Sequence, residues 1–292
     1  MRARAATASD GSGVAAAPTA TASTAGVLRP HEFARHVDLA REPVGESAGR
    51  WVENRWSLRW DLPQGRWFDS EVIPHPTCSL TLELGSHPRA AMPPGETVAV
   101  TGVCTRRFDV DLRGWGRVVG LRFRPGGLAA LTGHPASAWN DRSVPASEVL
   151  PPALASALAD PDLGEVGSAW AEVAEQGLAA LADDRPDPRY DLVLAVVADM
   201  LADHALLTVA DAAERHAVTV RTLQRLFTHY VGSVRSGCWR ATGCTTPSPT
   251  STPAGPARSP TSRCATAGTT RPTSRATSPR WSGCHPGSTA TG

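Results

Sequence analysis

The last 60 residues of this chain have a composition that excludes a packed domain of their own. Between positions 233 and 292, 38 residues are Ser, Thr, Pro or Gly, and none is Leu, Ile, Phe or Met. Such a tract buries too little apolar surface to offset the entropy cost of about 1–2 kcal/mol for each ordered residue. We therefore predict that residues 233–292 are disordered and that the fold is built from the residues before them.

The preceding residues divide into four zones with different patterns. Residues 1–26 are rich in Ala, Thr and Ser and lack the apolar region of a signal peptide, so we predict a disordered leader. Residues 27–150 contain short runs of alternating apolar and polar residues, typical of antiparallel strands. Residues 151–186 have the periodicity of a helical connector, and residues 187–232 contain further helices. The order of elements predicts an α+β fold.

Composition restricts the environment of the chain. Its net charge is +1, all 29 of its basic residues are Arg, and no run of about 18 apolar residues occurs, so we expect no membrane span. Cys78 and Cys104 are the only cysteines before the tail, which favours reduced thiols in the cytoplasm. Six of the nine tryptophans fall between Trp51 and Trp139, where we expect them to fill the core of the β-rich domain.

The segment from Ala205 to Gly232, ALLTVADAAERHAVTVRTLQRLFTHYVG, predicts two short helices joined by a tight turn. Thr208 and Thr219 occupy the positions at which a side chain caps the start of each helix. The apolar spacing of the second helix predicts that Val220, like the core residues, points inward. The residues that we expect to form the apolar core of this unit are Val209, Ala213, Val218, Leu223, Leu226 and Phe227.

The other face of the second helix carries the residues expected to point outward. This is the arrangement of a helix-turn-helix, whose second helix enters the major groove of DNA. Arginine suits the N7 and O6 acceptors of guanine, and glutamine suits adenine. The alternative is the ordinary solvated face of an amphipathic helix. The outward residues are Arg221, Thr222, Gln224, Arg225 and Thr228.

The same segment, and above all its RTLQRLF and following VG, resembles the first helix-turn-helix of the AraC/XylS family of bacterial transcriptional regulators. The resemblance implies a sequence-specific regulator that binds double-stranded promoter DNA. Arg221, Gln224 and Arg225 would approach base edges or phosphates, with the two threonines as weaker candidates. Ala217 stands where the family often has Gly in the turn, and Ala212 stands where it often has Leu.

A second resemblance lies upstream, in the segment VVGLRFRPGGLAALTGHPASAWNDRSVPASEVL that begins at Val118. It resembles an uncharacterised β-rich N-terminal domain that is often fused to AraC-type helix-turn-helix segments. In the wider family the N-terminal domain senses a small molecule, dimerises the protein, or does both. The resemblance therefore implies a small-molecule effector, a homodimer, or both for residues 27–150.

The family's DNA-binding domain normally has a second helix-turn-helix unit, and residues 233–292 carry no trace of it in the written frame. Codons for Thr and Ser overlap, in the neighbouring frame, codons for residues such as Tyr, His, Asp, Leu, Ile and Val. A slip beside the Gly232 codon permits the missing linker helix and second unit. We therefore predict a frameshift or a sequencing error, and weak DNA binding by the chain as written. An ordinary disordered basic tail is the alternative.

Other constellations point to binding or catalysis less directly. His75, Cys78 and His87 provide nitrogen and sulfur donors that suit Zn²⁺ if they meet on a hairpin, although plain turns also explain the spacing. No Ser/His/Asp set, phosphate-binding loop or dinucleotide fingerprint is present, so we expect no enzyme, no catalytic residue, no metal and no cofactor. The rival hypothesis is a small-molecule-binding or metal-dependent enzyme domain with a vestigial helical tail.

Two further features carry positive charge. Cys104 lies in an apparent strand and is followed by two arginines, which predict either a thiol of depressed pKa or a buried strand cysteine. Arg122 and Arg124 lie beside the two glycines of FRPGG. That turn predicts either an anion site built from backbone N–H groups or the exit from an edge strand.

Overall fold

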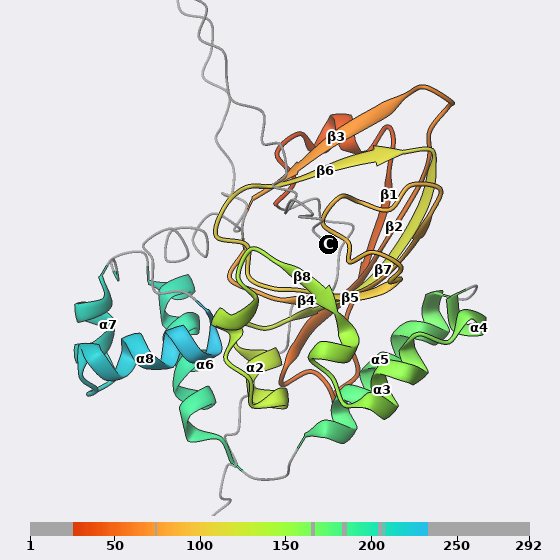
Figure 1. The fold of residues 1–292 in the computed structure, drawn as a ribbon. Coiled ribbons are helices and arrows are strands. Elements are labelled where there is room, and N and C mark those ends of the chain that lie inside the picture. Colours follow the sequence, from red (N-terminus) through yellow and green to blue (C-terminus); the bar gives the residue numbers. More distant parts are fainter. Residues whose placement is uncertain are drawn as a thin grey trace, which may run out of the picture. The chain divides into compact units, whose positions relative to one another are not determined.

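The computed structural model describes residues 26–73, 75–164, 167–182, 186–203, 206 and 208–232. The predictions for the leader up to residue 25, and the predictions of disorder and a frameshift in the tail from residue 233, lie outside these residues. Within the described part, antiparallel strands precede a series of helices (Figure 1). The predicted α+β fold is confirmed.

The larger of two sheets has six strands, and every neighbouring pair is antiparallel. The strand that carries VVGLRF is central, with one long neighbour on each side, so the prediction of an edge strand at FRPGG was wrong. In spatial order the strands are β1 (Asp38–Glu42), β2 (Val52–Asp61), β7 (Trp115–Phe123), β4 (Ser79–Gly85), β5 (Val98–Thr101) and β8 (Ser143–Pro145).

The smaller sheet consists of β3 (Trp67–Val72) and β6 (Phe108–Arg113), paired antiparallel along their whole lengths. Its apolar side chains, among them Phe68 and Leu112, form one cluster with Trp60 and Val118 of the larger sheet. A short helix, α1 (Pro30–Phe33), contributes to the same cluster. The two sheets therefore face each other, and this pairing encloses the cavity described below.

The opposite face of the larger sheet is covered by helices. Trp170 and Leu178 of α5 are completely buried in one cluster with Leu121 of β7, and the Trp170 indole Nε1 donates to the Leu158 carbonyl at 3.0 Å. The helices and 3-10 turns of this part are α2 (Gly127–Thr132), η1 (Ala136–Trp139), η2 (Ala146–Glu148), α3 (Pro152–Leu158), α4 (Pro161–Gly164) and α5 (Gly167–Leu181).

Figure 1 shows α6 (Pro188–Ala202), α7 (Val209–Arg215) and α8 (Val220–Tyr230) close together. Their apolar side chains form a third cluster, which also includes residues of α2 and η1. The Asn140 amide Nδ2, just after η1, donates to the Gly232 carbonyl at 2.6 Å. The helices after residue 187 are therefore held against the β-rich segment by a shared core.

The tryptophans do not all fill the core. Trp60 and Trp139 are buried, but Trp67 is 62% exposed and Trp115 is 53% exposed, so the prediction was wrong for these two. Trp67 alternates with the buried Phe68 along β3 and consequently points to the outer face. Trp115 is the first residue of β7, directly after the turn at Gly114, and its side chain is exposed at this end of the strand.

No helix in the described residues has both the length and the apolar character that crossing a bilayer requires.

Candidate functional site

The predicted helix starts are confirmed by their capping bonds. The Thr208 hydroxyl accepts from the Asp211 N–H at 3.1 Å, and the Asp211 carboxylate accepts from the Thr208 N–H at 3.1 Å, which completes a capping box on α7. The Thr219 hydroxyl accepts from the Thr222 N–H at 3.1 Å at the start of α8. Asp187 likewise caps α6. These bonds fix where each helix begins and therefore which residues face outward.

The turn between α7 and α8 depends on a left-handed residue. Ala217 has φ +52°, and the Val218 N–H reaches back to the Ala213 carbonyl at 2.9 Å. The Ala217 N–H donates to the Glu214 carbonyl at 3.1 Å, which completes a Schellman motif. Gly adopts this conformation without strain, whereas Ala in the left-handed region is strained.

We expect Ala217→Gly to raise the free energy of unfolding by about 1 kcal/mol, because Gly adopts a positive φ without the Cβ clash. Urea denaturation followed by circular dichroism measures the change. Ala195→Gly is the control, since Ala195 lies exposed in the middle of α6 and is expected to lose about 1 kcal/mol by the same substitution. A loss of stability in both variants would contradict the strained-turn interpretation.

The six residues predicted as the core of the unit lie in or against the third apolar cluster, that of α6, α7 and α8. Val220 does not. As the first residue of α8 it is 39% exposed, so the prediction that it points inward was wrong. The buried members are Ala213, Leu223 and Phe227, and the partly buried members are Val209, Val218 and Leu226.

The five residues predicted to read DNA are all exposed on α8. Their face is positively charged, because α8 contains two arginines and no acidic residue. The structure shows no ion pair to Arg221 or Arg225 from any residue it describes. Thr228 is partly engaged, since its hydroxyl donates to the Gln224 carbonyl at 2.9 Å, and Thr222 shares a hydroxyl contact of 2.8 Å with Thr219. Arg221, Gln224 and Arg225 are therefore the side chains best placed to meet a partner.

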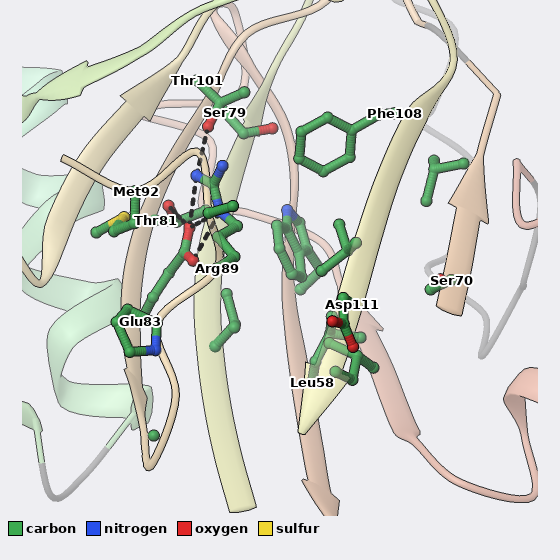
Figure 2. Close-up of a pocket in the computed structure, with 18 of the residues that line it drawn as sticks. Leu58, Ser70, Ser79, Thr81, Glu83, Arg89, Met92, Thr101, Phe108 and Asp111 are labelled. Atoms are coloured by element: carbon green, nitrogen blue, oxygen red, sulfur yellow. Dashed lines mark hydrogen bonds and ion pairs between the residues drawn. The ribbon is translucent and has the colours of Figure 1, made fainter. Parts of the chain in front are cut away.

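A cavity of about 980 Å³ between the two sheets is a second candidate site, which the sequence analysis did not identify (Figure 2). Trp56 and Leu58 of β2 line it from the larger sheet, and Phe108 and Leu112 of β6 line it from the smaller one. The alternation of SLTLE in β4 was a signal for it. The polar side chains of β4, which the alternating pattern alone assigns to a solvent-exposed face, line this cavity instead.

The polar side chains of the cavity wall include one row across five strands of the larger sheet. Partners in register are Asn54 with Arg122, Arg122 with Ser79, Ser79 with Thr101, and Thr101 with Ser143. Residues in register on adjacent strands lie on the same face of the sheet. Four members of the row, all except Ser143, line the cavity. The site is therefore amphipathic, with a polar row along one wall and apolar walls elsewhere.

An ion pair occupies the part of this wall nearest β5 (Figure 2). Arg89 Nε lies 2.8 Å from Glu83 Oε2, and Arg89 NH2 lies 2.9 Å from Glu83 Oε1. Arg89 also donates to the hydroxyls of Thr101 and Ser143, both at 3.0 Å, and its guanidinium lies 5.6 Å from the Phe108 ring centroid. These bonds use most of the five donors of Arg89, so the pair supports the wall rather than offering a free charge.

The three residues considered as zinc donors, His75, Cys78 and His87, are not brought together. Cys78 is buried in the helix-covered core, where burial raises the pKa of its thiol to about 12. His75 and His87 line the cavity on the other face of the sheet. Across the residues that the structure describes, no group of three His, Cys, Asp or Glu side chains is placed to hold a metal ion. These three residues therefore do not form a zinc site together.

Cys104 differs from both of its sequence interpretations. It follows β5 in a loop rather than lying in a strand. Burial and the neighbouring carboxylate of Asp141 raise the pKa of its thiol to about 11, and the charge of Arg89 offsets this shift only in part. The thiol is therefore protonated and weakly nucleophilic at neutral pH.

The FRPGG turn does not form a backbone anion site. Arg124 Nε donates to the Gly49 carbonyl at 2.7 Å, and the Gly127 N–H donates to the Arg124 carbonyl at 2.8 Å. Gly126 has φ +84° and Gly127 packs against the Trp51 backbone, so both glycines serve close packing. Arg122 alone of this group lines the cavity.

Comparisons with known proteins cover the β-rich part best. Residues 48–145, from just before β2 to the end of β8, match a domain of unknown function, DUF6597. This match agrees with the predicted resemblance to an uncharacterised β-rich domain. None of the curated proteins matches the chain. Among solved structures, an AraC-like transcriptional activator, CuxR, shares 13% identity over 73% of this chain and 93% of that chain, with a TM-score of 0.24. Similarity at this level does not establish a common fold.

Proposed function

We propose that this protein is a cytoplasmic DNA-binding transcriptional regulator of AraC type rather than an enzyme. The observation that carries the proposal is the outward face of α8, on which Arg221, Gln224 and Arg225 stand exposed with no acidic neighbour in the helix. The capped helix α7 and the Schellman turn hold this face on a buried core. A rigid helix with donors suited to guanine and adenine edges is what major-groove reading requires.

We expect Arg221→Ala, Gln224→Ala and Arg225→Ala each to weaken specific binding by about tenfold to a hundredfold, the usual range for one base-reading side chain. Because the operator is unknown, the whole chain is first used to select the duplexes that it binds from a random pool at low salt. Fluorescence anisotropy then compares the variants on the enriched duplex. Because base contacts carry sequence discrimination, the same substitutions are expected to cost less affinity for a random duplex than for the enriched one.

The matched control is Arg59→Ala, which removes the same charge from an exposed position on β2, away from α8. It is expected to leave specific binding unchanged. Equal affinities of the parent and the three α8 variants for the enriched duplex would refute recognition by α8. A version with the neighbouring reading frame restored after Gly232 is expected to bind more tightly, because it regains a second reading unit. If that version prefers no duplex over random competitor, the regulator proposal itself fails.

We further propose that the β-rich segment binds a small organic molecule, as the effector of the regulator. The cavity supports this role, because its volume of about 980 Å³ lies in the range of about 300–1,000 Å³ usual for ligand pockets. Its walls combine aromatic side chains with a few convergent polar groups, the usual composition of such pockets.

A further inference from the structure

Asn54, on β2, brings an unpaired acceptor into the wall of the cavity. Its Oδ1 is buried and accepts no hydrogen bond from any residue that the structure describes, which costs free energy. The χ2 torsion of asparagine is broad, so a small rotation turns this oxygen toward a ligand. His75 Nε2 is likewise buried and unpaired within the described residues, but it lies against Gly26, where an added Cβ would overlap it. A ligand that donates a hydrogen bond to Asn54 therefore stabilises the wall.

Arg122 of β7 supplies hydrogen-bond donors beside this acceptor. It is in register with Asn54 and also lines the cavity, and residues opposite each other on antiparallel strands have Cβ atoms about 4.5–5.5 Å apart. Arg122 Nε contacts Thr77 Oγ1 and Glu53 Oε2, each at 3.3 Å, and neither contact uses the two terminal NH₂ groups. Because the Glu53 carboxylate already faces the charge of Arg122, a ligand at this position does not have to be an anion.

This pairing of an acceptor with a donor selects a hydroxyl group. A polar group placed between Asn54 and Arg122 has to donate a hydrogen bond to the amide oxygen and accept one from the guanidinium. A carboxylate, a ketone or an ether oxygen only accepts, and an ammonium group only donates, so each of these leaves one of the two side chains unpaired. A hydroxyl does both through a single oxygen atom.

The other end of the polar row offers less to a ligand, because its polar groups bond to one another (Figure 2). The hydroxyls of Thr101 and Ser143 lie 3.0 Å apart, and Arg89 donates to both of them besides its two-pronged contact with Glu83. A ligand at that end has to displace these bonds before it forms its own. The end at Asn54 is therefore the better position for the polar group of a ligand.

The wall next to Asn54 suits an apolar body. Trp56 follows two residues later on the same face of β2 and lines the cavity. Its partner in register is Gly120, where an added Cβ would overlap the indole, so this glycine lets the ring lie close to β7 and leaves the space in front of it to a ligand. Leu58 extends the apolar surface along β2, and Phe108 adds an aromatic ring from β6.

We propose that the cavity binds a neutral, mainly apolar alcohol or phenol, whose hydroxyl lies between Asn54 and Arg122 and whose body packs on Trp56. The hydroxyl donates to Asn54 Oδ1 and accepts from a terminal NH₂ group of Arg122. The inference rests on the proposed small-molecule role of the β-rich segment and names the chemistry of the ligand.

The test is isothermal titration calorimetry of the full chain with octan-1-ol and its isomer 1-methoxyheptane, and with 2-naphthol, 2-methoxynaphthalene and 2-naphthoate. We expect each hydroxyl compound to bind about tenfold more tightly than its ether, because the ether cannot donate to Asn54. Asn54→Leu, which keeps the size of the side chain, is expected to remove this preference while the ethers still bind. Ser57→Ala, which removes a polar group from the other face of β2, is expected to keep it.

The outcomes separate the two proposals. Equal binding of alcohol and ether by the parent chain overturns the hydroxyl site and leaves the small-molecule role standing, and this comparison does not depend on the folding of any variant. Tighter binding of 2-naphthoate than of 2-naphthol has the same consequence, as does a preference that survives Asn54→Leu or is lost in Ser57→Ala. Binding of none of the probes overturns both proposals.

Discussion

Leu223→Ala is expected to lower the free energy of unfolding by about 3 kcal/mol and to loosen the DNA-binding face with it. Leu223 is completely buried in the cluster that joins α6, α7 and α8 to α2 and η1. Removing a fully buried leucine side chain costs about 2–5 kcal/mol, through lost burial and the cavity that remains. Alanine has the highest helix propensity, so the loss comes from packing and not from the helix itself.

Val220→Ala on the same helix is the matched control. Val220 is 39% exposed, so we expect a change within about 0.5 kcal/mol, of either sign. Urea denaturation gives both values, and hydrogen exchange of the α8 amides shows whether the opening is local. Similar losses from the two substitutions would mean that the facing of α8 is not as described here.

The start and the facing of α8 were predictable from sequence to different degrees. Thr219 marks the helix start by a local rule, since its hydroxyl caps the N–H three residues later. The inward residues Leu223 and Phe227 follow from the helical period. Val220 fits the same period but lies at the first position of the helix, where its side chain stays 39% exposed. Periodicity predicts the direction of a side chain, but how deeply the side chain is buried depends on its tertiary neighbours.

The cavity illustrates what sequence patterns leave undetermined. Ser79, Thr81 and Glu83 alternate with leucines, and this pattern correctly predicts that they share one face of a strand. That face meets the small sheet and not water. Only the pairing of β3 with β6, about 40 residues apart, closes the space. Cys78 and His75 are three residues apart and lie on opposite faces of the larger sheet, which removes the zinc site. Long-range pairing of strands therefore decides whether the polar face of β4 meets water or encloses a cavity.

Glu83→Ala is expected to be the most destabilising substitution in the cavity wall, with a loss of about 3–5 kcal/mol, the range for breaking a buried ion pair. The side chains of Glu83 and Arg89 are 14% and 11% exposed, and Glu83 also accepts from the Thr81 hydroxyl at 2.8 Å. Without Glu83 the guanidinium of Arg89 keeps its hydroxyl partners but loses its counter-charge inside the wall. The expected consequences are a lower urea midpoint and weaker binding of any ligand in the cavity.

Asp109→Ala provides the contrast that isolates burial as the cause. Arg107 Nε lies 2.7 Å from Asp109 Oδ1, as close as the buried pair at 2.8 Å, but both side chains are 55% exposed. An exposed pair is screened by water and contributes little, so we expect no measurable loss of stability. Glu83→Leu combined with Arg89→Met removes both buried charges and is expected to recover most of the stability lost by Glu83→Ala. Equal losses from Glu83→Ala and Asp109→Ala, or no recovery in the double variant, would show that the charge balance of the wall is not what stabilises it.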